Sequence, residues 1–147
     1  MTLKPREQTV LAFDFGSRRI GVATGNDLTR SAQPLTTLDS TDEQRLWLQL
    51  DRLIEEWQPG QLLVGLPDQD KSGITRDGAE RFAAELKSRY SLPLDMVAEH
   101  LTSFAAENEL KDSRRAGRKP HRVKTGEVDA VAARLIAEQW LNEAKHE

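Results

Sequence analysis

Short apolar runs recur along the 147-residue chain and predict five β-strands. Each run is bounded by glycine, proline or polar residues, which favour turns. The first two runs are separated only by Ser17–Arg19, a spacing typical of a β-hairpin. The strands expected from these runs cover residues 10–16, 20–25, 34–38, 61–66 and 93–99.

Apolar residues at intervals of three and four predict four α-helices. The first follows the sequence TDEQ at residues 41–44, which has the form of a capping box opened by Thr41. Pro59 ends this helix after Trp57. The three later helices are expected over residues 75–90, 102–110 and 127–143.

The order of these elements predicts an α/β fold. Three strands come first, and the remaining two strands are separated by helices, with two helices at the end. A hairpin at the start requires antiparallel pairing, whereas strands joined through helices favour parallel pairing. We therefore expect a central mixed five-stranded sheet flanked by helices.

Composition is that of an ordinary globular domain and limits the chemistry. The chain is 37% hydrophobic and 31% charged, which fits one domain over residues 1–147. The absence of cysteine excludes disulfides, thiolate metal sites and cysteine nucleophiles. Neither a membrane-spanning apolar run nor the apolar core of a secretion signal is present. We therefore expect a cytoplasmic protein.

Charge is distributed unevenly along the chain. The net charge is −3, but residues 111–124 contain seven Lys or Arg against one Asp, so that this segment is +6 and the rest is −9. A local basic patch on an acidic protein can bind phosphates. The basic candidates for nucleic-acid binding are Lys111, Arg114, Arg115, Arg118, Lys119, Arg122 and Lys124.

Three acids occupy positions where a carboxylate is unusual. Asp14 lies within an apolar strand, Glu99 ends the last expected strand, and Asp129 falls inside the apolar arc of the last helix. Each also has a structural interpretation. Asp14 can accept backbone N–H bonds from the following turn, strand ends are often polar, and a negative charge suits the first turn of a helix.

The same three acids can also converge at one edge of the sheet and share divalent cations. Hard carboxylate oxygens favour Mg²⁺ or Mn²⁺. Two such ions stabilise the attacking and leaving oxygens of a phosphodiester displacement. The hypothesis from the residues alone is therefore a metal site made of Asp14, Glu99 and Asp129, suited to phosphodiester hydrolysis.

Three ordered segments carry a resemblance to a known family. They are FDFGSRRIGVA at residues 13–23, VGLP at 64–67 with Gly73 beyond it, and VDAVAA at 128–133. Together they resemble the YqgF-type family, a bacterial branch of the RNase H-like superfamily. The resemblance extends from about Val10 to the last helix.

This resemblance implies an RNase H-like fold and a nuclease linked to 5′-end maturation of precursor 16S ribosomal RNA, in a family earlier described as Holliday junction resolvase-like. It matches Asp14 to the metal-binding acid of the first strand, Glu99 to the central acid and Asp129 to the acid of the C-terminal helix. The family usually has an Asp-Glu-Arg-Leu string around the central acid. Ala98 and His100 depart from that string here, so that a fixed cation is replaced by a group that titrates near neutrality.

The basic segment precedes the Asp129 helix and is therefore expected beside the metal site, where it would hold the nucleic-acid backbone without base specificity. A solvated surface loop is the alternative. Aromatic residues are few, and Trp47, Trp57 and Phe82 fit helix core positions better than base-stacking platforms. Backbone and shape recognition are thus favoured over sequence recognition.

The residues predict an Mg²⁺- or Mn²⁺-dependent nuclease, as a monomer or homodimer. The family resemblance implies ribosomal precursor RNA as its substrate and a ribosomal particle as a second partner. Two alternatives stay open. One is a DNA endonuclease that resolves four-way junctions, for which a dimer is usual. The other is a ribosome-assembly or nucleic-acid-binding factor that keeps the fold and cuts nothing, which the changes at Ala98 and His100 favour.

Overall fold

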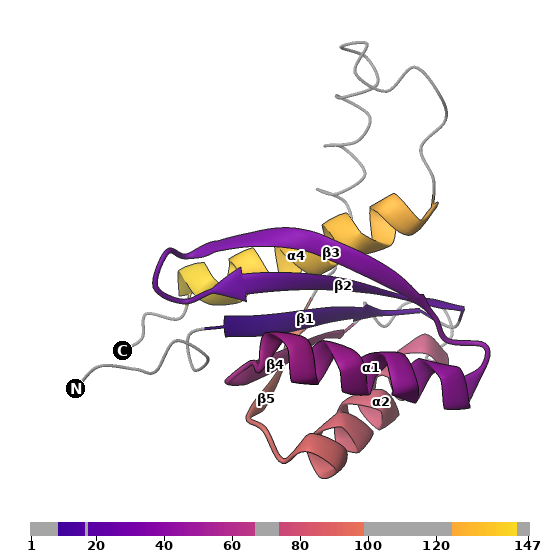
Figure 1. The fold of residues 1–147 in the computed structure, drawn as a ribbon. Coiled ribbons are helices and arrows are strands. Elements are labelled where there is room, and N and C mark those ends of the chain that lie inside the picture. The colour runs from indigo at the N-terminus through magenta and orange to yellow at the C-terminus, as the bar shows by residue number, and fades with distance from the viewer. Residues whose placement is uncertain (1–8, 17, 67–73, 99–124, 144–147) are drawn as a thin grey trace.

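The computed structural model describes residues 9–16, 18–66, 74–98 and 125–143, and for residues 74, 75 and 125–129 it describes only the backbone. Figure 1 shows a sheet with helices on both faces. The strands are β1 (Thr9–Phe15), β2 (Arg19–Asn26), β3 (Ser31–Asp39), β4 (Gln61–Leu66) and β5 (Leu94–Ala98), and the helices are α1 (Glu43–Trp57), α2 (Ile74–Tyr90) and α4 (Thr125–Glu143).

The sheet is five-stranded and mixed, as the sequence predicts. Its strand order is β3-β2-β1-β4-β5. Strand β1 pairs with β2 and β2 pairs with β3 in antiparallel fashion, whereas β1 with β4 and β4 with β5 are parallel. The central strand β1 thus joins an antiparallel half to a parallel half.

Several element boundaries are shifted by one to three residues from the prediction, and two of these differences have a structural explanation. Strand β3 begins at Ser31, three residues before the expected start, and pairs with β2 along its length around an irregularity at Val22/Ala23. Helix α1 is capped by Asp42, whose Oδ1 accepts from the Arg45 N–H at 3.2 Å, so the capping box opened by Thr41 is wrong by one residue. The Thr41 hydroxyl instead donates to Asp39 Oδ1 at 2.6 Å. The helix expected over 102–110 lies outside the described residues.

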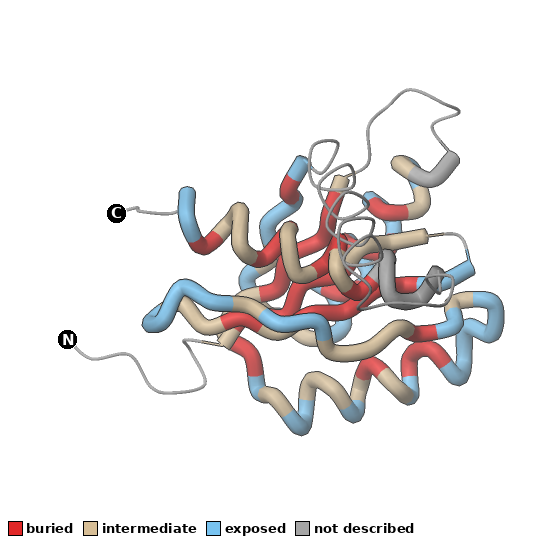
Figure 2. The backbone as a smooth tube through the Cα atoms, turned by 90° about the horizontal axis from the view of Figure 1, so that it is seen from above, coloured by how far each residue is buried: buried red, intermediate tan, exposed pale blue. Residues whose placement is uncertain are grey.

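The two faces of the sheet have separate cores. Helices α1 and α2 cover one face and α4 covers the other (Figure 1). Alternate residues of β1 reach different cores: Leu11 and Phe13 pack toward α1 and α2, and Val10 and Ala12 pack toward α4. Figure 2 shows the buried positions of the chain gathered toward the centre of the molecule.

Aromatic side chains fill the core between the sheet and helices α1 and α2. Phe82 meets Phe13 edge to face, with ring centroids 5.7 Å apart, and lies 5.9 Å from Trp47. Trp57 is partly buried against the same cluster. The prediction that Trp47, Trp57 and Phe82 are core residues is therefore confirmed.

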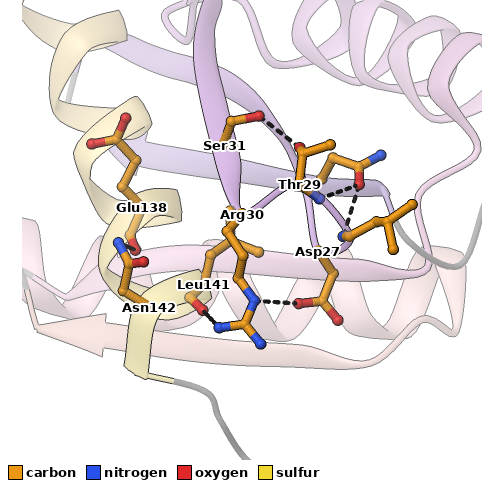
Figure 3. Close-up of polar contacts among 9 residues, drawn as sticks. Asp27, Thr29, Arg30, Ser31, Glu138, Leu141 and Asn142 are labelled. Atoms are coloured by element: carbon orange, nitrogen blue, oxygen red, sulfur yellow. Dashed lines mark hydrogen bonds and ion pairs between the residues drawn. The ribbon is translucent and has the colours of Figure 1, made fainter.

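Helix α4 is held at its C-terminal end by side chains from both halves of the sheet. Arg30, at the left-handed position of the β2–β3 turn, donates from Nη1 to the Leu141 carbonyl at 3.1 Å (Figure 3). Trp140 donates from Nε1 to Asp95 Oδ2 on β5 at 2.9 Å. A cation at the end of a helix stabilises carbonyls that lack partners within the helix. None of the described helices combines the length and apolar character needed to cross a membrane.

Helices α1 and α2 are joined by a polar clamp on their outer side. Arg89 binds both carboxylate oxygens of Asp51 at 3.1 Å, and the Tyr90 hydroxyl donates to Asp51 Oδ1 at 2.6 Å. The Arg89 guanidinium also lies over the Trp47 ring, 5.1 Å from its centroid. Hydrogen bonds from Arg89 and then Tyr90 lower the pKa of Asp51.

We predict that Asp51→Asn lowers stability at neutral pH and flattens the acid limb of the stability curve. Because the pKa of Asp51 is lowered in the folded state, its contribution is present above the unfolded pKa of about 3.9 and is lost as the pH falls through the folded value. Urea denaturation at several pH values between 7 and 3 should show the gap between wild type and Asp51→Asn closing as the pH falls. Glu56→Gln, at an exposed position of α1, is the control. A gap that does not vary with pH would contradict this role of Asp51.

Candidate functional site

Asp14 lies near the end of the central strand and on the face covered by α4. Its neighbours Phe13 and Phe15 both belong to the opposite core, and alternation along β1 therefore turns Asp14 toward α4. Phe13 is fully buried, whereas Asp14 is half-buried. The end of the strand thus limits the desolvation cost of a carboxylate within an apolar strand.

The strands beside Asp14 both place a glycine next to it. Gly21 of β2 is its direct antiparallel partner. On the other side Phe13 pairs with Val64, so that the next residue of β4, Gly65, is level with Asp14. Residues paired across a sheet point to the same face. At the positions level with Asp14, the two neighbouring strands therefore place no side chain on the α4 face.

The turn after Asp14 is tight and is held by the segment that follows β3. A Cβ atom added to Gly16 would lie 2.7 Å from the Arg19 carbonyl oxygen, so this close approach requires glycine. Ser40 donates from its N–H to the Arg18 carbonyl at 2.9 Å and from its hydroxyl to the Gly16 carbonyl at 3.3 Å. Ser40 therefore holds Gly16 and Arg18 on the two sides of this connection.

On the opposite face, Phe15 holds the end of β1 against α2. Its ring lies 5.4 Å from the Phe82 ring, and a Cβ atom added to Gly78 would come within 2.7 Å of Phe15 Cε2. Helix α2 can approach the strand this closely because residue 78 has no side chain. The direction of Asp14 is thus set by packing on the face away from it.

The structure describes only part of the predicted acid trio. Strands β1, β4 and β5 run in the same direction, and Leu66 pairs with Ala98, so their C-terminal ends share one edge of the sheet with Asp14. Glu99 follows Ala98 in sequence but lies outside the described residues. Its placement at the metal site stays a prediction.

Asp129 belongs to α4, and the structure describes its backbone but not its side chain. Leu141 packs near Gly25 and Val10, at the start of β1, so α4 runs back along the sheet with its N-terminal half toward the end of β1 (Figure 1). Ala132 and Ile136 of the expected apolar arc are buried, but Val131, Leu135 and Trp140 are only half-buried. The buried face is instead completed by Ala133, Ala137 and Leu141. The C-terminal end of α4 is held by Arg30 and Trp140, and its N-terminal half therefore lies toward the sheet edge that holds Asp14.

The remaining predicted site residues fall outside the described part of the chain. These are Arg114, Arg115, Arg118, Lys119, Arg122 and Lys124. Among the side chains that the structure describes, no cluster of three or more His, Asp or Glu is found. That set includes Asp14 but neither Glu99 nor Asp129, so the predicted trio is left untested.

Sequence reasoning missed two features around Asp14. The flanking pair Gly21 and Gly65 becomes visible only when the strand register is known, although both glycines stand in the segments that carried the family resemblance. The contacts of Ser40 join residues more than twenty positions apart in sequence. No local pattern signals either feature.

Comparison with known proteins gives the family. Residues 8–143 match the model of the RuvX family, described as Holliday junction resolvase. The chain belongs to the RuvX family. This confirms the resemblance to a nuclease family that the sequence motifs indicated. The prediction of an enzyme that cleaves phosphodiester bonds is confirmed with it.

Two bacterial relatives of this RuvX chain are similar to it over nearly their full length. A protein of Dechloromonas aromatica is 41% identical over 141 residues, covering 94% of this chain and 93% of the relative. A protein of Legionella pneumophila is 40% identical over 137 residues, covering 92% and 96%. Both are named "Putative pre-16S rRNA nuclease".

Solved structures confirm the RNase H-like fold of this RuvX member. Thermus thermophilus RuvC, solved in complex with a Holliday junction substrate, superposes with a TM-score of 0.63 and 14% identity, covering 96% of this chain and 99% of RuvC. The Fowlpox virus resolvase, solved with Holliday junction DNA, gives a TM-score of 0.57 and 6% identity, covering 94% and 99%. At these identities the likeness concerns the fold.

We predict that Gly16→Ala destabilises the protein by about 1–3 kcal/mol, because the new Cβ would meet a backbone oxygen that cannot move without opening the hairpin. Gly25→Ala is the matched control in the same sheet. There the added Cβ would lie 3.2 Å from the flexible tip of Leu141 and 3.3 Å from the Ser31 carbonyl oxygen, so the cost should be smaller. Urea denaturation measures both, and a larger loss in Gly25→Ala would contradict the tight-turn explanation.

Proposed function

We propose that this protein is a divalent-metal-dependent nuclease that matures the 5′ end of precursor 16S rRNA. The observation that carries the proposal is the position of Asp14, half-buried at the end of the central strand and flanked by two glycines. The names of the Dechloromonas and Legionella relatives support the substrate. Action on a ribosomal precursor would place the protein in the cytoplasm.

The residues available at this edge suit Mg²⁺ or Mn²⁺. Asp14 offers hard carboxylate oxygens, and the neighbouring glycines add no side chain that would compete for the space beside them. We assign Glu99 and Asp129 as the other ligands, because one follows β5 at the same sheet edge and the other belongs to the half of α4 that leads toward it. When bound, the cation supplies Lewis acidity toward a phosphate oxygen.

The protein's own groups bind and orient the nucleic acid in this proposal. Asp14 is held in place from behind by Phe15 and from the side by the Gly16 turn. The basic residues of segment 111–124 precede α4 in sequence and are proposed to contact backbone phosphates. Such contacts fix the position of the strand without reading its bases.

A second candidate substrate is a four-way DNA junction. The description of the RuvX family names it, and the RuvC structure with the same fold was solved with such a junction. Two symmetric cuts would require a dimer, so junction cleavage also bears on the oligomeric state. The departures at Ala98 and His100 make a binding factor without turnover the third outcome to be tested.

We predict that Asp14→Asn abolishes cleavage of a structured RNA containing the 5′ leader of precursor 16S rRNA. The substitution removes the charge that would hold the cation, so the loss should exceed the roughly 10–100-fold effect of removing an outer-shell partner. Cleavage is measured with Mg²⁺, with Mn²⁺ and with chelator, in parallel with a four-way DNA junction. Asp27→Asn, on the β2–β3 turn at the other end of the sheet, is the matched control.

The outcomes of this assay separate the three candidates. Metal-dependent cutting of the RNA alone, lost in Asp14→Asn but not in Asp27→Asn, supports the proposal. Cutting of the junction alone identifies a resolvase instead. Retained binding without any cutting by the wild type would overturn the nuclease proposal and make the protein a binding factor, and full activity in Asp14→Asn would remove this residue from the mechanism.

We further predict that changing Arg114, Arg115 and Arg118 to Gln weakens RNA binding and flattens its salt dependence. Each lost phosphate contact should reduce the slope of log K against log salt by about 0.7 for a single strand or 0.9 for a duplex. The control triple variant Arg52→Gln, Arg81→Gln, Lys87→Gln removes the same charge from exposed positions of α1 and α2. Equal slopes for the two triple variants would mean that the basic segment is only solvated.

A further inference from the structure

A shallow hollow lies beside the turn that follows Asp14. Its volume is about 330 Å³. The lining residues come from the start of β2 and from the end of β3 with the residues that follow it. They are Arg18, Arg19, Thr37, Leu38, Asp39 and Thr41.

The hollow lies at the same end of the sheet as Asp14, and part of its lining is on the same face. Gly21 pairs with Asp14 on one side and with Thr37 on the other, so Asp14 and Thr37 are separated only by a glycine along one row. Arg19 precedes Gly21 by two residues and therefore points to the same face, about 7 Å further along β2. A strand of nucleic acid that lies over Asp14 and Gly21 would reach this hollow.

Positive charge dominates the hollow although it contains Asp39. The Oδ1 atom of Asp39 accepts from the N–H of Thr41 at 2.9 Å and from its hydroxyl at 2.6 Å. These bonds, together with the nearby charges of Arg45 and Arg19, lower the pKa of Asp39 and occupy one of its carboxylate oxygens. Arg18 is exposed and has no acidic partner among the residues that the structure describes. Its guanidinium is therefore available to an anion.

The backbone that carries Arg18 is well supported. Its carbonyl accepts from the Ser40 N–H at 2.9 Å, and the Ser40 hydroxyl donates to the Gly16 carbonyl at 3.3 Å. A supported backbone lowers the entropy cost of ordering a side chain on a ligand. The Arg18 side chain is thus exposed to solvent, while its backbone is held by a hydrogen bond.

We propose that Arg18 and this hollow form a phosphate-binding subsite for the nucleic-acid strand, beside the bond that is cut. The proposal rests on the proposed nuclease function and adds a contact that neither the acid trio nor segment 111–124 supplies. Because Arg18 lies on the connection that follows the Asp14 strand, the subsite takes a phosphate that neighbours the scissile bond in the same strand. The planar guanidinium suits bidentate binding of a phosphate group.

The test measures binding without cutting, in the full-length Asp14→Asn protein. The probes are a fluorescent RNA containing the 5′ leader of precursor 16S rRNA and a fluorescent four-way DNA junction, each titrated at several salt concentrations. Adding Arg18→Ala should weaken binding about tenfold and reduce the salt slope by about 0.7–0.9. Arg18→Lys should keep the slope and recover only part of the affinity, because it retains the charge but not the planar fork.

Arg52→Ala is the matched control, since Arg52 is also an exposed arginine but lies on α1, over the opposite face of the sheet. Equal binding by the Arg18→Ala and Arg52→Ala proteins, with the parent still binding, would overturn the subsite and leave the proposed function standing. A parent and a wild type that both bind neither probe would overturn both proposals. An effect of Arg18→Ala on the RNA alone supports a subsite for RNA, and an equal effect on both probes supports one for any phosphodiester backbone.

Discussion

The pairing of β1 between β2 and β4 is the constraint on which the rest of the structure depends. The strand is hydrogen-bonded on both sides and covered on both faces, so each of its residues has a fixed surrounding. Leu11 and Phe13 fill one core while Val10 and Ala12 fill the other. The position of Asp14 follows from this alternation, because a strand that places Phe13 and Phe15 against Phe82 must turn the intervening residue the other way.

The two faces of the sheet use different packing. Large aromatic and aliphatic side chains separate the sheet from α1 and α2, whereas alanines at 132, 133 and 137 line the buried side of α4. Small residues allow a helix to lie close to a sheet. Asp14 turns to this α4 face, where the helix lies close to the sheet. The carboxylate therefore does not interrupt the aromatic core, which lies on the opposite face.

Most of the fold could be predicted from the sequence because the buried strands and helices have strong apolar patterns. The five strands, their mixed pairing and the described helices agree with that pattern. The start of β3 could not be found in this way, since the strand lies at the edge of the sheet and much of it is exposed. The cap of α1 was misplaced because Thr41 and Asp42 are both good capping residues, and the Thr41 hydroxyl is used by Asp39 instead.

The candidate site was predictable only in part. An acid within an apolar strand marks Asp14 from the sequence alone, but the glycines on either side of it depend on the register of three strands. The proximity of Arg18 and Thr37 to that acid likewise depends on the β1–β2–β3 pairing. Long-range pairing of this kind is set by the whole sheet, which a local pattern does not contain.

The short connection between β1 and β2 has a consequence for how such a chain can vary. Gly16 and the two residues after it join β1, which carries Asp14, to β2, which carries its paired residue Gly21. Lengthening the connection by one residue could be absorbed as a bulge, but shifting the register by one residue would exchange the polar and aromatic faces of the pair. Natural variation in chain length should therefore collect in the β2–β3 turn, at the end of the sheet away from Asp14, and spare the connection at Gly16.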